Sequence, residues 1–146
     1  GGLGNDTFTV ENVADVVMEF AIEGYDTVNS FISYTLTANV ERLSLEGIDN
    51  LDGIGNELDN VLNGNNANNH LVGGAGDDTL QGKGGTDLLE GGHGNDLYYV
   101  DNVGDTVLEL ANEGVDKVSS NIDYTLSANV ERLFLTGIAG LTVTVN

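Results

Sequence analysis

The stretch GGAGDDTLQGKGGTDLLEGGHGNDLYY (73–99) decides the fold, because it divides without remainder into three nine-residue units. The units follow the pattern G-G-x-G-x-D-x-U-x, where U is a large apolar residue, except that Lys83 replaces the second Gly of the middle unit, and GGLGNDTFT (1–9) follows the pattern fully. Upstream, GNELDNVLN (55–63) and GNNANNHLV (64–72) keep the first Gly and the apolar eighth position but carry Asn in place of Asp. The U column reads Leu62, Leu71, Leu80, Leu89 and Tyr98. Such a fixed register predicts stacked repeats.

A longer repeat contains the short one. Residues 1–51 match residues 91–141 at an offset of 90, with about 31 identical positions and no gap. Ninety is a multiple of nine, so the offset preserves the short register. We therefore expect a single repeat array over 1–146. In it, 1–9 and 55–99 are nonapeptide repeats, while 10–54 and 100–146 are duplicated segments of the YTLxANVExL type.

The segments between the glycine-rich loops predict strands. Runs such as DTVNSFISYTL (26–36) and VERLSL (40–45) are rich in β-branched or aromatic residues and alternate apolar with polar positions. No Gly-free stretch of useful length has helical spacing. A flexible linker is the alternative for the Gly-Asn-Asp loops, but a linker would not hold an apolar residue at every ninth place.

The charge excludes several functions. The chain has 24 Asp and Glu against 4 Lys and Arg, a formal charge of −20, and no Cys. This charge opposes binding to nucleic acid or to an anionic lipid surface, and thiolate sites are excluded. No apolar run approaches the roughly 20 residues of a membrane helix. Because the carboxylates repel one another in a compact state, we expect a bound cation to support folding.

The loop chemistry indicates calcium. A G-G-x-G-x-D loop needs backbone conformations that glycine adopts cheaply, and it can turn its carbonyls inward beside the Asp carboxylate. Carbonyl and carboxylate oxygens are the ligands that Ca²⁺ takes, six to eight of them. One loop cannot surround the ion, so stacked loops would share it.

These units resemble the RTX (hemolysin-type) calcium-binding nonapeptide repeat, and with the YTLxANVExLxLxG stretches (34–47 and 124–137) the resemblance covers nearly the whole chain. It implies an all-β fold, a right-handed parallel β-roll or β-solenoid with two nonapeptides per turn and calcium between stacked loops. We expect about seven or eight turns. It also implies export by type I secretion machinery and folding on extracellular calcium.

The resemblance also implies ligands. Between loops 73–78 and 91–96, an ion would be held by Asp78, Asp96 and the carbonyls of Gly74, Gly76, Gly91 and His93. Further carboxylate pairs are Asp87 with Asp105, Asp96 with Asp116, and Asp6 with Asp26. The remaining candidates are Asp15, Gly2, Gly4, Gly82, Lys83, Gly84, Gly85, Gly92 and Gly94. Asn60 and Asn69 lack the carboxylate, so their sites should be weak or empty, with hydrogen-bonded Asn side chains instead.

The function we expect is a secreted, extracellular calcium-binding module that aids folding or export of a larger protein. Two alternatives stay open: a module that binds polysaccharide or cell-surface glycan, and a structural repeat of an adhesin or surface layer. An enzyme is not expected, because no Ser–His–Asp set or nucleophile elbow is present. We interpret His70 and His93 as exposed loop residues, and expect Arg42 and Arg132 to pair with carboxylates.

Overall fold

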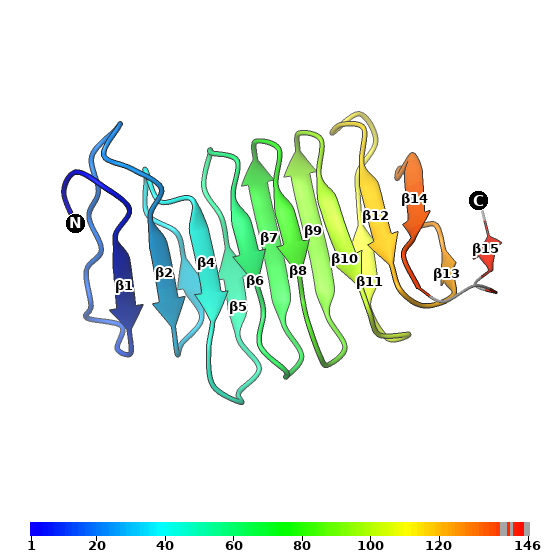
Figure 1. The fold of residues 1–146 in the computed structure, drawn as a ribbon, viewed down its shortest axis with the longest axis horizontal. Coiled ribbons are helices and arrows are strands. Elements are labelled where there is room, and N and C mark those ends of the chain that lie inside the picture. The colour runs from blue at the N-terminus through cyan, green and yellow to red at the C-terminus, as the bar shows by residue number, and fades with distance from the viewer. Residues whose placement is uncertain (138–139, 141, 145–146) are drawn as a thin grey trace.

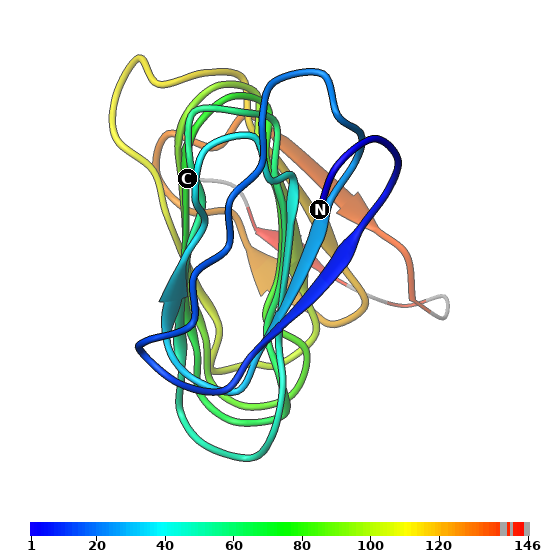
Figure 2. The same cartoon turned by 90° about the vertical axis from the view of Figure 1, so that its left-hand side faces the viewer.

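The chain forms an all-β solenoid. The structure is a computed structural model that describes residues 1–137, 140 and 142–144. Viewed from the side, the strands run across the long axis (Figure 1), and viewed along it they form two facing walls joined by loops (Figure 2). No helix occurs among the described residues, and none of them forms an apolar helix long enough to cross a membrane. The all-β, parallel solenoid expected from the sequence is confirmed.

Every strand pairs in parallel with the strand of the next turn. One wall is an eight-stranded sheet of β1 (Thr7–Val10), β2 (Thr27–Ser30), β4 (Arg42–Leu45), β6 (Val61–Asn63), β8 (Thr79–Gln81), β10 (Leu97–Val100), β12 (Lys117–Ser120) and β14 (Arg132–Leu135). The other is a five-stranded sheet of β3 (Tyr34–Thr35), β5 (Asp52–Ile54), β7 (His70–Ala75), β9 (Leu88–His93) and β11 (Thr106–Leu108). A third pair joins β13 (Tyr124–Thr125) to β15 (Val143–Thr144). Part of the 100–146 segment, residues 138–139, 141 and 145–146, lies outside the described residues.

The turns differ in length. Eight strands of one sheet delimit seven turns, and their pairing registers give successive lengths of 20, 15, 19, 18, 18, 20 and 15 residues. In this sheet two nonapeptides therefore make one turn only from β6 to β10, and in the facing sheet the 18-residue spacing runs from β5 to β11. The first five lengths add to 90, which is the offset of the long repeat. Compared with 18 residues, the first turn has two more, the second has three fewer and the third has one more, so these differences cancel.

The apolar column of the nonapeptides forms the core. Its members are fully buried: Leu62, Leu71, Leu80, Leu89 and Tyr98 each expose 0 % of their surface. Leu62, Leu80 and Tyr98 stack in the eight-stranded sheet, whereas Leu71 and Leu89 stack in the facing one. Alternate units thus supply opposite walls, since a nine-residue unit is half a turn.

The loops depend on left-handed backbone at their second and fourth positions. Gly74 and Gly76 have φ of 112° and 109°, and Gly85 has 113°. Lys83 takes the same region with φ of 66°, a conformation that is uncommon for a residue with a side chain. The first glycine is needed for space, because a Cβ on Gly73 would overlap Oδ2 of Asp78.

We predict that Leu71→Ala lowers the free energy of unfolding by about 2–5 kcal/mol, because it leaves a cavity between the walls. Chemical denaturation in the presence of calcium measures this. Ile48→Ala, at a side chain that is 90 % exposed, is the control and should change little. A loss below 1 kcal/mol for Leu71→Ala would contradict a closely packed core.

Candidate metal-binding loops

A column of hydrogen bonds joins the loops along one edge of the solenoid, which we call the first loop edge (loops 55–60, 73–78, 91–96 and 111–116; top of Figure 1). The amide of Asn60 donates to Oδ1 of Asp78 at 2.7 Å, and the amide of Asp78 donates to Oδ1 of Asp96 at 2.8 Å. The amide of Asp96 donates in turn to Oδ1 of Asp116 at 2.9 Å. Each carboxylate is therefore fixed by the preceding turn through one oxygen.

The second carboxylate oxygen is free. Oδ2 of Asp78, Asp87 and Asp96 is buried without a hydrogen-bond partner. A buried oxygen of this kind is costly unless something else satisfies it. This is the oxygen a cation would take.

Loop carbonyls lie near that free oxygen and between the stacked loops. A Cβ on Gly73 would touch both Oδ2 of Asp78 and the carbonyl of Gly91, so these two oxygens face the same place. The carbonyls of Gly74 and Gly76 lie against the next loop, at Gly92 and Gly94. The carbonyl of His93 faces back and accepts a hydrogen bond from the amide of Gly76 at 2.9 Å. The predicted ligands between 73–78 and 91–96 are thus brought together, and this all-oxygen set fits a hard cation such as Ca²⁺.

The opposite edge, or second loop edge (loops 64–69, 82–87 and 100–105), repeats the arrangement. The amide of Asn69 donates to Oδ1 of Asp87 at 2.7 Å, and the amide of Asp87 donates to Oδ1 of Asp105 at 3.1 Å. Oδ2 of Asp105, however, accepts the amides of Asp101 and Asn102 in its own loop. The structure brings Asp87 and Asp105 together, with a single free oxygen on Asp87.

Asp15 stands apart from this pattern. Its exposed carboxylate accepts the amides of Glu11 and Asn12, both at 2.9 Å, and these bonds lower its pKa. Asp15 therefore closes its own turn and is not brought against a second loop.

In the loops that carry Asn60 and Asn69, the side-chain amide groups are hydrogen-bonded, as expected. Nδ2 of Asn60 lies 3.3 Å from the carbonyl of Val40 and 3.4 Å from that of Glu41, and Oδ1 accepts the amide of Asn56. Nδ2 of Asn69 donates to the carbonyl of Leu51 at 3.0 Å. Each side-chain amide thus donates to backbone carbonyls of the preceding turn.

Four glutamates that the sequence pattern did not predict lie beside the loop Asp residues. Glu41 and Glu131 accept the amides of Asp26 and Asp116 at 2.7 and 2.8 Å, so they continue the column across the 15-residue turns. Glu19 and Glu109 complete two clusters, each with carboxylate oxygens within 4.8 Å of one another: Asp6 with Glu19 and Asp26, and Asp96 with Glu109 and Asp116. Glu19 and Glu109 stand at matching places in the repeated segments MEF and LEL, and Glu41 and Glu131 stand in the two copies of VERL. The turns that contain these segments do not keep the nine-residue spacing, so the repeat pattern did not mark the glutamates.

Burial raises the pKa of the carboxyl groups. It is the first cause for Asp78, whose pKa rises to about 7, and for Asp87 and Asp96, whose pKa values rise to about 6. Neighbouring carboxylates add to the effect, while the backbone hydrogen bonds oppose it. Burial and then the charges of Asp116 and Asp96 raise the pKa of Glu109 to about 8. Protons therefore compete with any cation for these oxygens.

The remaining candidates have other roles. His93 is exposed, as expected, but it is the last residue of β9, and His70 is the first residue of β7, so the placement of both in loops was wrong. Nε2 of His70 lies 2.8 Å from Oε1 of Glu90. The Arg42 guanidinium lies over the ring of Tyr25, 5.7 Å from its centroid, and no carboxylate pairs with it within the described part of the chain.

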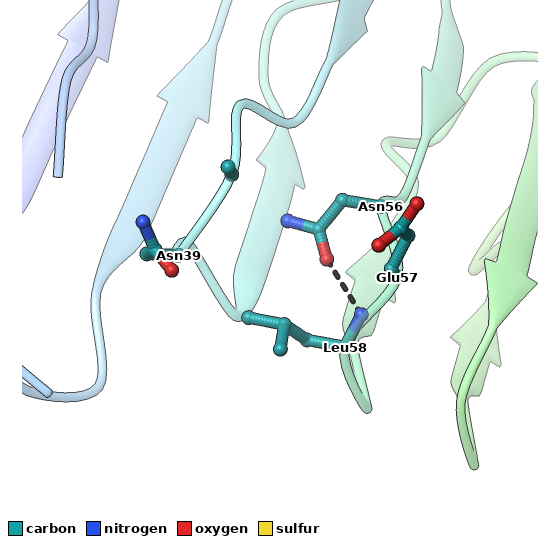
Figure 3. Close-up of a pocket in the computed structure, with 5 residues that line it drawn as sticks. Asn39, Asn56, Glu57 and Leu58 are labelled. Atoms are coloured by element: carbon teal, nitrogen blue, oxygen red, sulfur yellow. Dashed lines mark hydrogen bonds between the residues drawn. The ribbon is translucent and has the colours of Figure 1, made fainter. Parts of the chain in front are cut away.

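A surface hollow of about 370 Å³ lies at Ala38, Asn39, Asn56, Glu57 and Leu58 (Figure 3). Oδ1 of Asn56 accepts the amide of Leu58 there, so this side chain is already engaged in holding its own loop.

Comparison with known proteins agrees with this geometry. The family model of the RTX calcium-binding nonapeptide repeat, four copies long, matches residues 54–89 and again 72–107. Two proteins of Rhizobium meliloti (strain 1021) are similar over 64 residues, 44 % of this chain: endo-1,3-1,4-beta-glycanase ExsH at 39 % identity and endo-1,3-1,4-beta-glycanase EglC at 31 %. The match spans only 14 % of the length of each. No solved structure matches.

We predict that, without metal, the fold becomes more stable as the pH falls from about 8 towards 5. The buried carboxyls of the folded state have pKa values of about 6 to 8, above their ordinary values of 3.8 and 4.5. The folded chain therefore holds protons that the unfolded chain releases, and its stability falls as the pH rises through this window. Thermal unfolding of metal-free protein measures it.

The control for this pH dependence is Asp78→Asn, which should flatten the part of the dependence near pH 7. A midpoint that drops on acidification would contradict the assignment.

Proposed function

We propose that this chain, whose residues 54–107 are RTX calcium-binding nonapeptide repeats, is a module that folds when it binds extracellular calcium and thereby stabilises a larger exported protein. The observation that carries the proposal is the buried, unpartnered Oδ2 of Asp78 and Asp96 in stacked loops lined with carbonyls. We therefore assign this chain a role in calcium binding and folding, and no catalytic role.

The best site lies between loops 73–78 and 91–96. We assign Asp78, Asp96 and the carbonyls of Gly74, Gly76, Gly91 and His93 as its ligands, which gives the six oxygens of a minimal Ca²⁺ shell. Asp87 with Asp105 forms a second site on the other edge. The loop glycines and Lys83 contribute backbone, and the free oxygens of Asp78, Asp87 and Asp96 support both assignments.

Calcium binding is coupled to folding by the charge of the chain. With 24 acidic and 4 basic residues, the compact state repels itself, and the loops gather carboxylates from separate turns. An ion that binds only the gathered loops stabilises the folded state by mass action. Millimolar calcium outside a cell suits such a module, which could pass through a type I secretion channel unfolded.

The relatives support a shared module and not a shared reaction. Both are named glycanases, yet the matched segment is 14 % of each. We therefore assign the common segment to calcium binding and leave glycan cleavage to those proteins.

We predict that the chain gains β structure on titration with Ca²⁺ and not with Mg²⁺, measured by far-ultraviolet circular dichroism from a chelated start. Asp78→Asn removes one carboxylate and should raise the calcium concentration at the midpoint by about tenfold or more. Asp52→Asn, in an exposed strand position, is the matched control. Equal midpoints for the two variants, or full β structure in chelator, would overturn the proposal.

A second candidate function is binding of an anionic polysaccharide on the outer face of the eight-stranded sheet. By strand alternation, this face carries Thr7, Thr9, Thr27, Asn29, Arg42, Ser44, Val61, Asn63, Thr79, Gln81, Leu97, Tyr99, Lys117, Ser119, Arg132 and Phe134. It includes three of the four basic residues and no carboxylate, in a chain of charge −20. Tyr99 and Phe134 are 40 % and 50 % exposed, and exposed rings can stack on sugars.

We predict that a polyuronate retards the calcium-loaded chain in affinity electrophoresis and that the double variant Arg42→Ala/Lys117→Ala weakens this retention by about tenfold, since each lost ion pair is worth up to about 1 kcal/mol. Lys83→Ala removes one positive charge from a loop off this face and is the control for each single variant, Arg42→Ala and Lys117→Ala. A neutral glucan that is retained equally well would point to stacking instead of charge. Absence of retention would exclude the candidate.

A further inference from the structure

A small polar hollow opens on the outer face of the eight-stranded sheet, where β8, β10 and β12 end at the second loop edge (Figure 1). Its volume is about 80 Å³, and apart from Val100 its lining residues are polar or aromatic: Gln81, Tyr99, Asp101, Ser119, Asn121 and Thr136. A closed ligand pocket has roughly 300–1,000 Å³. This hollow therefore takes only the edge of a ring-shaped ligand, and the rest of the ligand lies on the sheet.

The polar side chains of the hollow are free to bind a ligand. The side chains of Gln81, Ser119 and Asn121 and the hydroxyl of Tyr99 form no hydrogen bond with another residue of the described chain. Tyr99 is 40 % exposed and lies between Gln81 and Ser119 in the strand registers. Amide and hydroxyl groups both donate and accept hydrogen bonds, and an exposed ring offers an apolar face. The combination suits a sugar, which has hydroxyls at its edge and C–H bonds on its faces.

Two cations without carboxylate partners stand at the rim of the hollow. Lys117 and Arg132 are direct neighbours in the pairing of β12 with β14, and neither forms an ion pair within the described ranges. The Lys117 ammonium lies over the ring of Phe134, 4.5 Å from its centroid, and Phe134 is in register with Ser119 of the hollow. In a chain of charge −20, a local positive charge beside free hydrogen-bonding groups favours a ligand that is both hydroxylated and acidic.

The first copy of the 90-residue repeat lacks these residues. In place of Tyr99, Lys117, Ser119, Asn121 and Thr136 it carries Thr9, Thr27, Asn29, Phe31 and Glu46. The ring of Phe31 lies against the following turn, because a Cβ on Gly47 would be 3.7 Å from its Cδ1. The backbone of the repeat accepts both sets of side chains, so the ring, the amide and the cation of the second copy are not required by the fold.

We propose that the hollow and its rim bind one acidic sugar residue, with the sugar ring against Tyr99, its hydroxyl edge at Asn121 and its carboxylate at Lys117 and Arg132. The ligand class rests on the second candidate function, the binding of an anionic polysaccharide. The proposal adds a single site with a fixed orientation of the sugar.

The charges at the two ends of the hollow set that orientation. Lys117 is the first residue of β12, whereas Asp101 directly follows the last residue of β10, so the two charges lie at opposite ends of neighbouring strands. The Asp101 carboxylate accepts hydrogen bonds from sugar hydroxyls and repels the carboxylate of the sugar. The acidic group is therefore directed to Lys117, and a neutral sugar lacks this preference for one direction.

Substitutions that restore the residues of the first copy test the site, because the repeat already folds with them there. A uronate disaccharide is titrated into the calcium-loaded full chain, and nuclear magnetic resonance follows the side-chain amides of Gln81 and Asn121. Asn121→Phe fills the hollow and Tyr99→Thr removes the ring, so each should weaken binding by about tenfold, the scale of one lost hydrogen-bonding or stacking contact. Lys117→Thr should reduce the preference over the neutral disaccharide by about fivefold.

Leu110→Phe is the matched control, since it also introduces the first copy's ring, at a side chain just after β11 that is 62 % exposed. It should leave the affinity unchanged, and circular dichroism in calcium checks that every variant folds. Unchanged affinity in Asn121→Phe and Tyr99→Thr would overturn the site, and polyuronate retention that still depends on Arg42 would then leave the second candidate function standing. Disaccharide binding that depends on Asn121, without retention of the polymer, would support the site and exclude the extended binding face.

Discussion

The bond from a loop amide to the carboxylate one turn further on governs the rest of the structure. The amides of Asp78 and Asp96 each donate to Oδ1 of the next Asp at 2.8 and 2.9 Å. The bond holds one oxygen of that side chain, and the other oxygen, Oδ2, lies buried without a hydrogen-bond partner in Asp78 and Asp96. The same contact therefore stacks the turns and prepares an anionic pocket, which couples the stability of the solenoid to whatever neutralises the pocket.

The charge of the loops differs in three ways along the first loop edge. In the loop of Asn60 an amide group donates to carbonyls and carries no charge. In the loops of Asp78 and Asp96 raised pKa values make a proton or a cation the two competing occupants. At Glu109 a third carboxylate increases the charge that must be balanced. The number of carboxylates gathered at this edge thus grows from the loop of Asn60 to the 20-residue turn that carries Glu109.

The nine-residue period predicts the elements that keep this spacing, and it does not predict the site residues in turns of other lengths. The leucine column, the parallel solenoid and the pairing of Asp78 with Asp96 follow from a nine-residue unit that is half a turn. Glu109 escapes because it replaces a glycine in a turn with two extra residues. Glu131 escapes because a turn three residues short brings a strand-flanking glutamate to the place of a loop Asp. Such residues can be aligned only once the strand register is known.

The unequal turn lengths also protect the array from slippage. Identical 18-residue turns could shift by one whole turn and still place Leu on Leu and Asp on Asp, so that a misfolded chain would resemble the native one in local energy. Turns of 20, 15 and 19 residues break this translational symmetry, since a shifted chain would bring Glu41 or Glu109 opposite the wrong neighbour. The irregular turn lengths of the duplicated segments thus allow the repetitive chain only one register of strand pairing.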